Sequence, residues 1–332
     1  MTMRNLPVRW GLSLPNRGVL FGLTSIEAIM EAVELAEESQ VFESVWFGDS
    51  LIHKPRLESV VMLSAVASRT RRARLGVMCM ASFPVRDPVL LAIQWATLDQ
   101  ISGGRTVLGV CIGGGHAPEL NTFGVKRSER AGRMEEGLEL LRKLWAEGET
   151  SHHGRFYNVE GLQLVPKPAQ KTVPIWIAVS PDRDKVGDRV VDNAMRRVGM
   201  LADGYITMGV TAEEFHRRWE VIEATAAKIG KDLSSFETSI HGMVNINDDR
   251  RVAYEESKSY FNHYYGPGYP SEELLKVWLA HGPPAQCAGL IQGWIDMGIT
   301  TPVLRFTAPD QISQMHRFIG EVLPRLELNR RP

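Results

Sequence analysis

Short apolar runs alternate with longer segments of helical periodicity along almost the whole chain. An apolar run over residues 8–14 comes first, and a helix is expected to open at Thr24, where Glu27 completes a capping box. The stripe from Ile26 to Val33 then forms one apolar face of that helix. Near-continuous apolar runs are typical of parallel strands that crossover helices bury on both faces. The alternation therefore predicts a series of strand-helix units.

About eight runs have the length and composition of a strand. They lie at residues 8–14, 44–47, 73–80, 105–111, 173–179, 204–207, 236–246 and 302–306. Later helices are expected at residues 57–69, 87–101, 134–145, 189–201, 212–229, 249–260, 285–297 and 309–323. Eight strands, each followed by a helix, predict an α/β fold of the (β/α)8 TIM barrel type. A doubly wound sheet is the alternative, but the turn after the first run lacks the Gly-x-Gly-x-x-Gly fingerprint of dinucleotide-binding sheets.

Two segments interrupt this rhythm within what we interpret as a single domain over residues 1–332. Residues 151–168 alternate in short pieces with glycine and proline, which favours an inserted hairpin after the fourth helix. Residues 247–300 form a longer helical and loop insertion between the seventh and eighth strands. Its stretch 261–270 is rich in aromatic and turn-forming residues. A lid over the site, a dimer contact and a packed surface loop all fit this stretch.

Composition narrows the class of partner. Lys and Arg number 38 and Asp and Glu 39, so the chain lacks the basic excess of a nucleic-acid or membrane-surface binder. No apolar stretch reaches the length of a membrane span, and the N-terminus has no secretory pattern. The three cysteines, Cys79, Cys111 and Cys287, are too few and too widely spaced for a disulfide framework or a structural zinc site. We expect a cytoplasmic protein whose partners are small molecules or other proteins.

In a barrel the chemistry lies where strands end, so polar residues after each run become candidates. The candidate positions are Asn16, Asp49, His53, residues 78–82, residues 111–116 with Gly113 and His116, residues 180–183, and Arg305. Asp49 would either accept a hydrogen bond from a ligand or cap a turn. His53 and His116 are acid/base candidates by position alone, and each also fits a plain surface residue.

Two loops among these candidates suit an anion or a flat ring. The glycine-rich residues 111–116 allow close backbone approach, and a flexible turn explains them equally well. Ser180 and Arg183 suit a phosphate, while an ordinary Ser-Pro turn is the alternative. Neither loop is a Walker motif, no histidine pair has the spacing of a helical zinc motif, and no Gly-x-Ser-x-Gly elbow is present. We therefore predict no metal.

Several motifs in a fixed order resemble the bacterial-luciferase-like superfamily. They include LDQISGGR at residues 98–105, ESVWFGD at 43–49, PIWIA at 174–178 and ADGY at 202–205. The resemblance extends over nearly the whole chain. It implies a TIM barrel that uses reduced FMN or the deazaflavin F420 and that is usually a homodimer.

The resemblance also implies roles for single residues. It implies a cis peptide bond between Met78 and Cys79 that supports the flavin ring, with Cys111 beside the reactive face. Ser180 matches a phosphate-binding serine, and Arg183 is a second phosphate candidate. Two positions depart from the pattern: Ser50 stands where a histidine is common, and Ile112 where luciferase has an arginine.

Our main hypothesis from the sequence is an FMN-dependent monooxygenase in which reduced FMN and O₂ act on a small organic substrate, with a flavin reductase as a possible supplier of reduced FMN. An F420-dependent hydride-transfer enzyme is the alternative within the same superfamily. A non-catalytic flavin-binding sensor is the alternative of another class, because the expected histidine is missing at Ser50. The sequence does not identify the substrate.

Overall fold

A closed parallel barrel forms the centre of the computed structural model, which describes residues 6–328. Its strands follow one another in the order β11-β1-β2-β3-β4-β7-β8-β9, and pairing of β9 with both β8 and β11 closes the ring. Every one of these pairings is parallel, so all the carboxyl ends meet at one rim. The barrel strands are β1 (Trp10–Leu14), β2 (Phe42–Asp49), β3 (Arg74–Met80), β4 (Thr106–Val110), β7 (Ile175–Ala178), β8 (Gly204–Thr207), β9 (Glu237–Ile246) and β11 (Thr301–Phe306). The predicted (β/α)8 barrel is confirmed.

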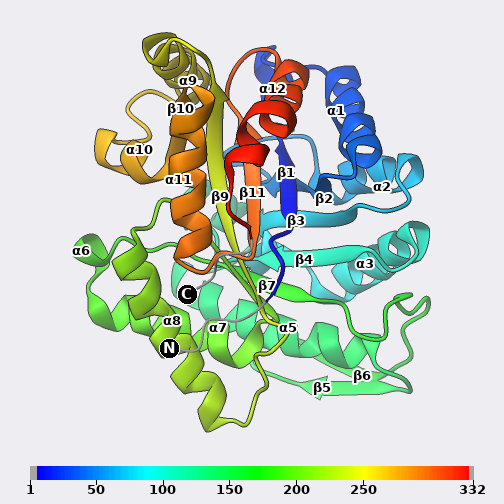
Figure 1. Cartoon of the computed structure of the whole chain (residues 1–332). Coiled ribbons are helices and arrows are strands. Elements are labelled where there is room, and N and C mark those ends of the chain that lie inside the picture. Colours follow the sequence, from blue (N-terminus) through cyan, green and yellow to red (C-terminus); the bar gives the residue numbers. More distant parts are fainter. Residues whose placement is uncertain (1–5, 329–332) are drawn as a thin grey trace.

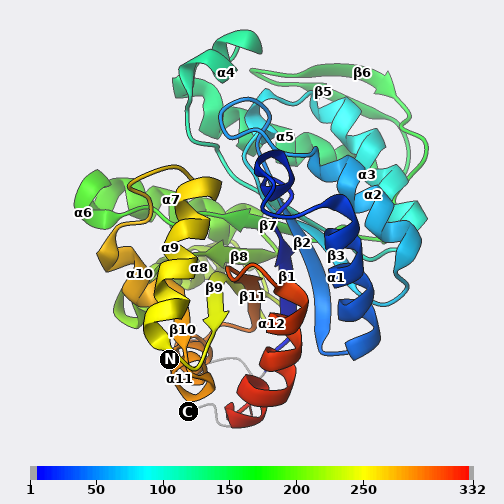
Figure 2. The same cartoon turned by 90° about the horizontal axis from the view of Figure 1, so that it is seen from above.

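Helices connect successive strands and surround the ring (Figures 1 and 2). They are α1 (Ile26–Ser39), α2 (Ser59–Arg69), α3 (Pro88–Ser102), α4 (Ala117–Thr122), α5 (Arg130–Trp145), α6 (Arg183–Val186), α7 (Asp188–Leu201), α8 (Ala212–Lys228), α9 (Arg250–Tyr264), α10 (Glu272–Trp278), α11 (Pro284–Asp296) and α12 (Gln311–Arg317). Their starts follow the sequence locally: the Ser25, Asp87 and Thr211 side chains each accept a hydrogen bond from a backbone N–H in the first turn. The cap of α1 is thus Ser25, one residue after the predicted Thr24. None of the helices among residues 6–328 is both long and apolar enough to cross a bilayer.

The first predicted insertion is an antiparallel hairpin of β5 (Thr150–His153) and β6 (Asn158–Leu162). It lies at one edge of the molecule, outside the barrel (Figure 1). The second insertion contains more regular structure than the sequence indicated. Helix α9 continues to Tyr264 instead of ending at residue 260, and α10 and a short strand, β10 (Leu279–Gly282), follow it.

Strand β10 brings this second insertion to the rim. β9 is long enough to pair with β8 through its first residues and with β10 through its last four, Met243–Ile246. The insertion is thereby fixed beside the carboxyl ends of the barrel strands. Its aromatic side chains form a separate buried cluster with β9, and this cluster includes Tyr260, Phe261, Tyr264 and Trp278.

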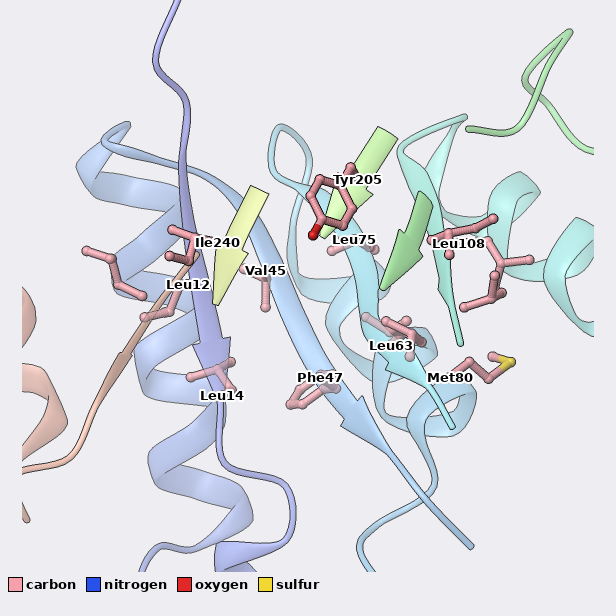
Figure 3. Packing of buried hydrophobic residues seen from close by; sticks show 14 of the residues in the cluster. Leu12, Leu14, Val45, Phe47, Leu63, Leu75, Met80, Leu108, Tyr205 and Ile240 are labelled. Carbon is pink, nitrogen blue, oxygen red and sulfur yellow. The ribbon is translucent and has the colours of Figure 1, made fainter. Parts of the chain in front are cut away.

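Apolar side chains on the outer face of the strands pack against the helices and form the main core. Leu12, Val45 and Leu75 on successive strands belong to this layer, and Leu63 of α2 packs against it (Figure 3). Burial of such side chains is the main stabilising contribution to a barrel of this kind.

Two tryptophans fill the inside of the barrel. The ring centroids of Trp46 and Trp176 lie 5.2 Å apart. They fit because Gly76 and Gly204 have no side chain: a Cβ at Gly76 would lie 2.2 Å from the Trp46 ring, and one at Gly204 would lie 2.6 Å from Trp176. Above them, toward the rim, the inward positions carry polar side chains.

Candidate active site

The candidate residues lie on two arcs of the same rim. Following the ring, β3, β4 and β7 are neighbours on one side, and β11, β1 and β2 are neighbours on the other. Met78, Cys79, Cys111 and Ser180 belong to the first arc. Asp49, with the residues that follow it, belongs to the second.

Both carboxylate oxygens of Asp49 accept hydrogen bonds from neighbouring residues. Its carboxylate accepts hydrogen bonds from the Ser59 hydroxyl at 2.9 Å, from the Ser82 N–H at 2.9 Å and hydroxyl at 2.5 Å, and from the Arg86 guanidinium at 2.9 Å. Arg86 also pairs with Glu58. The carboxylate therefore joins β2, α2 and the loop after β3, and these contacts leave it little capacity to act on a ligand. A catalytic role for Asp49 stays a prediction, and the contacts favour a positioning role.

The predicted cis bond between Met78 and Cys79 is wrong. The cis bonds among residues 6–328 precede prolines, at Val165–Pro166 and Tyr269–Pro270. β3 instead has a bulge at the same point: two residues, Met78 and Cys79, oppose the single Gly109 of β4. The extra residue turns the chain where the resemblance implies a cis bond.

Gly109 permits this bulge. A Cβ there would lie 2.0 Å from the carbonyl oxygen of Val77, so any larger residue would push the strands apart. The Met78 side chain points into the barrel and packs with Trp46 and Trp176. Met78 thus supports the floor of the rim, which suits the predicted contact with a flat ring.

Cys79 and Cys111 form a disulfide between the ends of β3 and β4, with their Cα atoms 5.7 Å apart. The expectation that no cysteines pair is therefore wrong. Spacing along the sequence, 32 residues here, does not reveal a pair that the barrel brings onto adjacent strands. Cys287 is free and buried, and burial raises the pKa of its thiol to about 12.

The glycine-rich loop after β4 is held by backbone contacts. A Cβ on Gly113, whose φ is +68°, would lie 2.4 Å from the carbonyl oxygen of Ala81. The Arg130 guanidinium donates to the carbonyls of Ile112 and Gly113. Packing alone thus explains a glycine at this position, and the proposed cofactor contact of Gly113 stays a prediction.

His53 and His116 come together although they follow different strands. Their rings stack with centroids 4.2 Å apart, and the Glu119 carboxylate accepts a hydrogen bond from the backbone N–H of His53 at 2.8 Å. Burial and the neighbouring His116 lower the pKa of His53. The Nδ1 of His116 is shielded from solvent and has no partner in the described chain. The two histidines remain acid/base candidates, His53 in the loop after β2 and His116 in the loop after β4.

Ser180 and Arg183 form part of a polar network at the end of β7. The Ser180 hydroxyl donates to the Met208 carbonyl at 2.5 Å and accepts from buried Arg218 at 3.3 Å. Arg183 pairs with Glu214 and Asp188, and the hydrogen bonds that it donates to these two carboxylates raise its pKa. Arg183 is therefore engaged with protein acids, and Ser180 is the better placed of the two predicted phosphate contacts.

The sequence did not single out His241, which points into the barrel from β9. Its Nε2 is shielded from solvent and has no hydrogen-bond partner among residues 6–328. Burial, with smaller effects from Arg305 and Arg56, lowers its pKa well below 6.5. The imidazole is consequently neutral at pH 7 and has one ring nitrogen available for a ligand.

Arg305 was a candidate position in the sequence analysis to which no role was given. It is one of the largest fully buried side chains, at 2% exposure. Its guanidinium donates to the Ser13 hydroxyl at 2.7 Å and the Leu14 carbonyl at 2.9 Å, and it lies 5.0 Å from the centroid of the Tyr264 ring. Burial raises the pKa of Tyr264, but Arg305 and Arg56 more than reverse this and lower it overall. Its hydroxyl, like that of Tyr260, has no hydrogen-bond partner in the described chain.

These orphaned polar atoms indicate a ligand site. Buried polar groups are normally hydrogen-bonded, since an unmet one costs about 1–3 kcal/mol. The atoms of this kind on Arg305 and Tyr264 lie toward the carboxyl ends of the barrel strands, where enzymes of this architecture bind their ligands. Arg72, which also has such an atom, precedes β3 and lies at the opposite end. No group of three or more His, Cys, Asp and Glu side chains within residues 6–328 is arranged to hold a metal ion.

Comparison with known proteins identifies the family of the chain. The family model for luciferase-like monooxygenases matches residues 8–301. The chain belongs to the luciferase-like monooxygenase family. It is accordingly an oxidoreductase, and the superfamily resemblance read from the sequence is confirmed.

The names of similar proteins give two kinds of oxidoreductase, F420-dependent dehydrogenases and a monooxygenase. An F420-dependent glucose-6-phosphate dehydrogenase of Kineococcus radiotolerans is 26% identical, over 87% of this chain and 90% of that protein. A monooxygenase of Streptomyces bottropensis has a similar structure, with a TM-score of 0.78 at 22% identity over 95% of this chain and 99% of that one. The structure of an F420-dependent secondary alcohol dehydrogenase in complex with an F420-acetone adduct has a TM-score of 0.77 at 18% identity. That comparison covers 97% of this chain and 100% of the other. The two structures establish the likeness of fold.

The residues on the first arc fit a flavin or deazaflavin. The β3 bulge leaves Met78 and Cys79 outside the regular ladder with β4, so the backbone there can face a flat polar ring. Ser180 lies further along the same arc with its hydroxyl half-buried. The orphaned nitrogen of His241 and hydroxyl of Tyr264 complete a set of polar groups that suits a substrate beside such a ring.

Proposed function

We propose that this protein is an F420-dependent oxidoreductase that transfers a hydride between the deazaflavin and an organic substrate. The observation that carries the proposal is the unpartnered Nε2 of a neutral His241 inside the barrel mouth, next to Arg305. F420 dependence of a relative that aligns over 87% of the chain supports the choice of cofactor. The main hypothesis from the sequence was reduced FMN, with F420 as the alternative, and the F420 dependence of the relatives favours F420.

The protein's own groups divide into two tasks. Met78 and the β3 bulge would support the ring, and Ser180 would hold its phosphate-bearing side chain. F420, when bound, supplies the hydride acceptor or donor. The residues of the second arc would then orient the substrate against the ring.

His241 would exchange the substrate proton. A neutral imidazole accepts a proton from a substrate hydroxyl at Nε2 while the hydride departs, and returns it in the opposite direction. Burial inside the barrel keeps His241 neutral, and Arg305 adds a smaller effect because like charges repel. The Tyr264 hydroxyl, with its lowered pKa, is a second polar group at the same place.

The aromatic cluster of the insertion would exclude water from this reaction. Tyr260, Tyr264 and Trp278 are buried against β9, and Phe261 stacks on Trp278 with ring centroids 5.6 Å apart. Water exclusion serves an FMN-dependent monooxygenase equally well, because it protects reactive oxygenated species. The structural likeness to a monooxygenase keeps that reaction as the second candidate. A homodimer, a flavin-reductase partner and a cytoplasmic location remain predictions.

Anaerobic turnover tests the proposal. Protein with oxidised F420 is incubated with a panel of alcohols and sugars, and loss of the deazaflavin absorbance is followed. We expect one substrate class to reduce F420, and His241→Gln to lower kcat at least a hundredfold with little change in F420 affinity. His263→Gln, which changes an exposed histidine on α9, is the matched control. Full activity of His241→Gln would overturn the assigned role.

A further inference from the structure

Four cations gather on the second arc of the rim without carboxylate partners among residues 6–328. Arg17 follows β1, Lys54 and Arg56 follow β2, and Arg305 lies on β11. Their contacts are with carbonyl and hydroxyl oxygens and with aromatic rings. The arrangement differs from that of the other buried arginines, since Arg86 and Arg218 pair with acids.

The cations are close enough to repel one another. Burial lowers the pKa of Arg17 and Lys54, and Arg56 lowers both further. The Arg56 guanidinium lies against the backbone of Gly48, where a Cβ would come within 2.1 Å of its Nη1. Arg56 thus reaches back over the end of β2 toward Asn16, whose Oδ1 would be 3.9 Å from that Cβ.

Several N–H groups of this cluster lack an acceptor. Nε of Arg305, and Nε and Nη1 of Arg17, are shielded from solvent and have no hydrogen-bond partner in the part of the chain described. A buried donor without an acceptor is costly, and a buried charge without a counter-charge more so. Guanidinium donors of this kind match the oxygens of a phosphate or carboxylate in pairs.

The position separates this cluster from the cofactor residues. Met78, Cys79 and Ser180 lie on the β3-β4-β7 arc, whereas the cations lie on the β11-β1-β2 arc. The tyrosines of the insertion cover the cations: Lys54 lies 5.5 Å from the Tyr265 ring and Arg305 lies 5.0 Å from that of Tyr264. An anion held here would therefore belong to the substrate.

We propose that Arg17, Arg56 and Arg305 form a subsite for the phosphate group of a phosphorylated substrate, with Lys54 adding charge at its edge. Four uncompensated positive charges match a dianionic phosphate ester better than a monoanionic carboxylate. The identity of the ligand as substrate rests on the proposed function, because that function assigns the other arc to the cofactor. The subsite itself is a property of the protein without cofactor.

Calorimetric titration of the full chain with inorganic phosphate, at fixed moderate salt, tests the subsite without turnover. We expect one saturable site, and a loss of affinity of at least tenfold in Arg56→Gln and in Arg17→Gln, since each removes a charged donor. Arg127→Gln, which changes an exposed arginine after α4, is the control and should bind as the parent does. Arg305→Lys, checked for folding by circular dichroism, should also weaken binding. No saturable binding, or parental affinity in both Arg56→Gln and Arg17→Gln, would overturn the proposal.

A second titration separates the substrate from the cofactor as the source of the phosphate. The protein is first saturated with F420 and then titrated with phosphate, and the same affinity is expected. Displacement of phosphate by F420 would assign the cluster to the cofactor and overturn the proposal. F420 reduction by neutral substrates alone would also overturn it and leave the proposed function standing. Phosphate binding in a protein that never reduces F420 would leave the subsite standing and remove the proposed function.

Discussion

His241 and Arg305 occupy neighbouring strands of the barrel and point into the same mouth. Val303 is the direct partner of His241, so Arg305 lies two residues further toward the rim. Burial of the imidazole, with a smaller effect from the Arg305 charge, lowers the pKa of His241 and favours the neutral ring, which is the form that accepts a proton. The same feature makes the folded protein sensitive to acid.

Stability should fall as pH drops below 6.5, the pKa of an ordinary histidine, because folding lowers the pKa of His241. Below 6.5 the unfolded chain binds a proton that the folded chain refuses, so protonation favours unfolding; above 6.5 neither state is charged and the effect disappears. Thermal unfolding across this range in the parent and in His241→Gln measures it. We expect a shallower acid slope in the variant. Equal slopes would show that His241 does not have the lowered pKa, whatever the absolute stabilities, while His53 and His281 contribute to both slopes alike.

The sequence revealed some of these residues and missed others for physical reasons. Arg305 was visible as a charge within an apolar run, TPVLRF, at the end of the last predicted strand. His241 gave no such signal, because a histidine in a ten-residue strand is compatible with either face. Tyr264 reaches Arg305 only because α9 continues past residue 260 and β10 fixes the insertion at the rim. Contacts of that kind depend on tertiary packing, which local periodicity does not encode.

At the scale of elements, Asp49 connects β2 with the start of α2 and the loop after β3. The sequence left two alternatives for Asp49, a ligand contact and a turn cap. Its contacts resemble those of a cap, but they connect three segments of the chain through Ser59, Ser82 and Arg86. The carboxylate is 5% exposed and bonded to three residues. Removing this carboxylate would leave Arg86 with Glu58 as its one acid partner and would take the acceptor from the Ser59 and Ser82 hydroxyls.

Asp49→Ala should therefore destabilise the fold by roughly 3 kcal/mol, the scale for breaking a buried ion pair. Urea unfolding of the variant and of Asp184→Ala, at an exposed aspartate of α6, gives the comparison. The control should lie within about 0.5 kcal/mol of the parent. A normally stable Asp49→Ala with lost turnover would instead point to a catalytic carboxylate.

The β3-β4 pair combines three features that periodicity alone did not reveal: the bulge, the glycine opposite it and the disulfide. Strand boundaries were predicted to within a few residues, because burial on both faces requires the apolar runs. Register was not, since it depends on how neighbouring strands meet.

Thiol titration without reductant checks the disulfide. The native protein should show no reactive thiol, because Cys287 is buried and its pKa is raised to about 12. After denaturation one thiol should react, and after reduction all three cysteines should. Cys287→Ser should then show none before reduction. Three reactive thiols in denatured, unreduced protein would contradict the pairing of Cys79 with Cys111.

For the molecule as a whole, the arithmetic of strands and helices was sufficient to predict the barrel. Each unit buries its own apolar run, so closure follows from the repeat. The hairpin at residues 151–168 was also recognised from its alternation and turns. The insertion at 247–300 was located but not resolved into β10 and α10, because its short segments are stabilised by the aromatic cluster they form together. Whether it closes over bound ligands as a lid stays a prediction.

The choice of cofactor is the central claim, and a paired titration tests it most directly. The same protein preparation is titrated with oxidised F420 and with reduced FMN under anaerobic conditions, and O₂ uptake is then recorded after admitting air. We predict saturable, tighter binding of F420, reduction of bound F420 by a phosphorylated substrate, and no substrate-coupled O₂ uptake. Binding of reduced FMN with substrate-coupled O₂ uptake, and no binding of F420, would contradict the account and favour the monooxygenase.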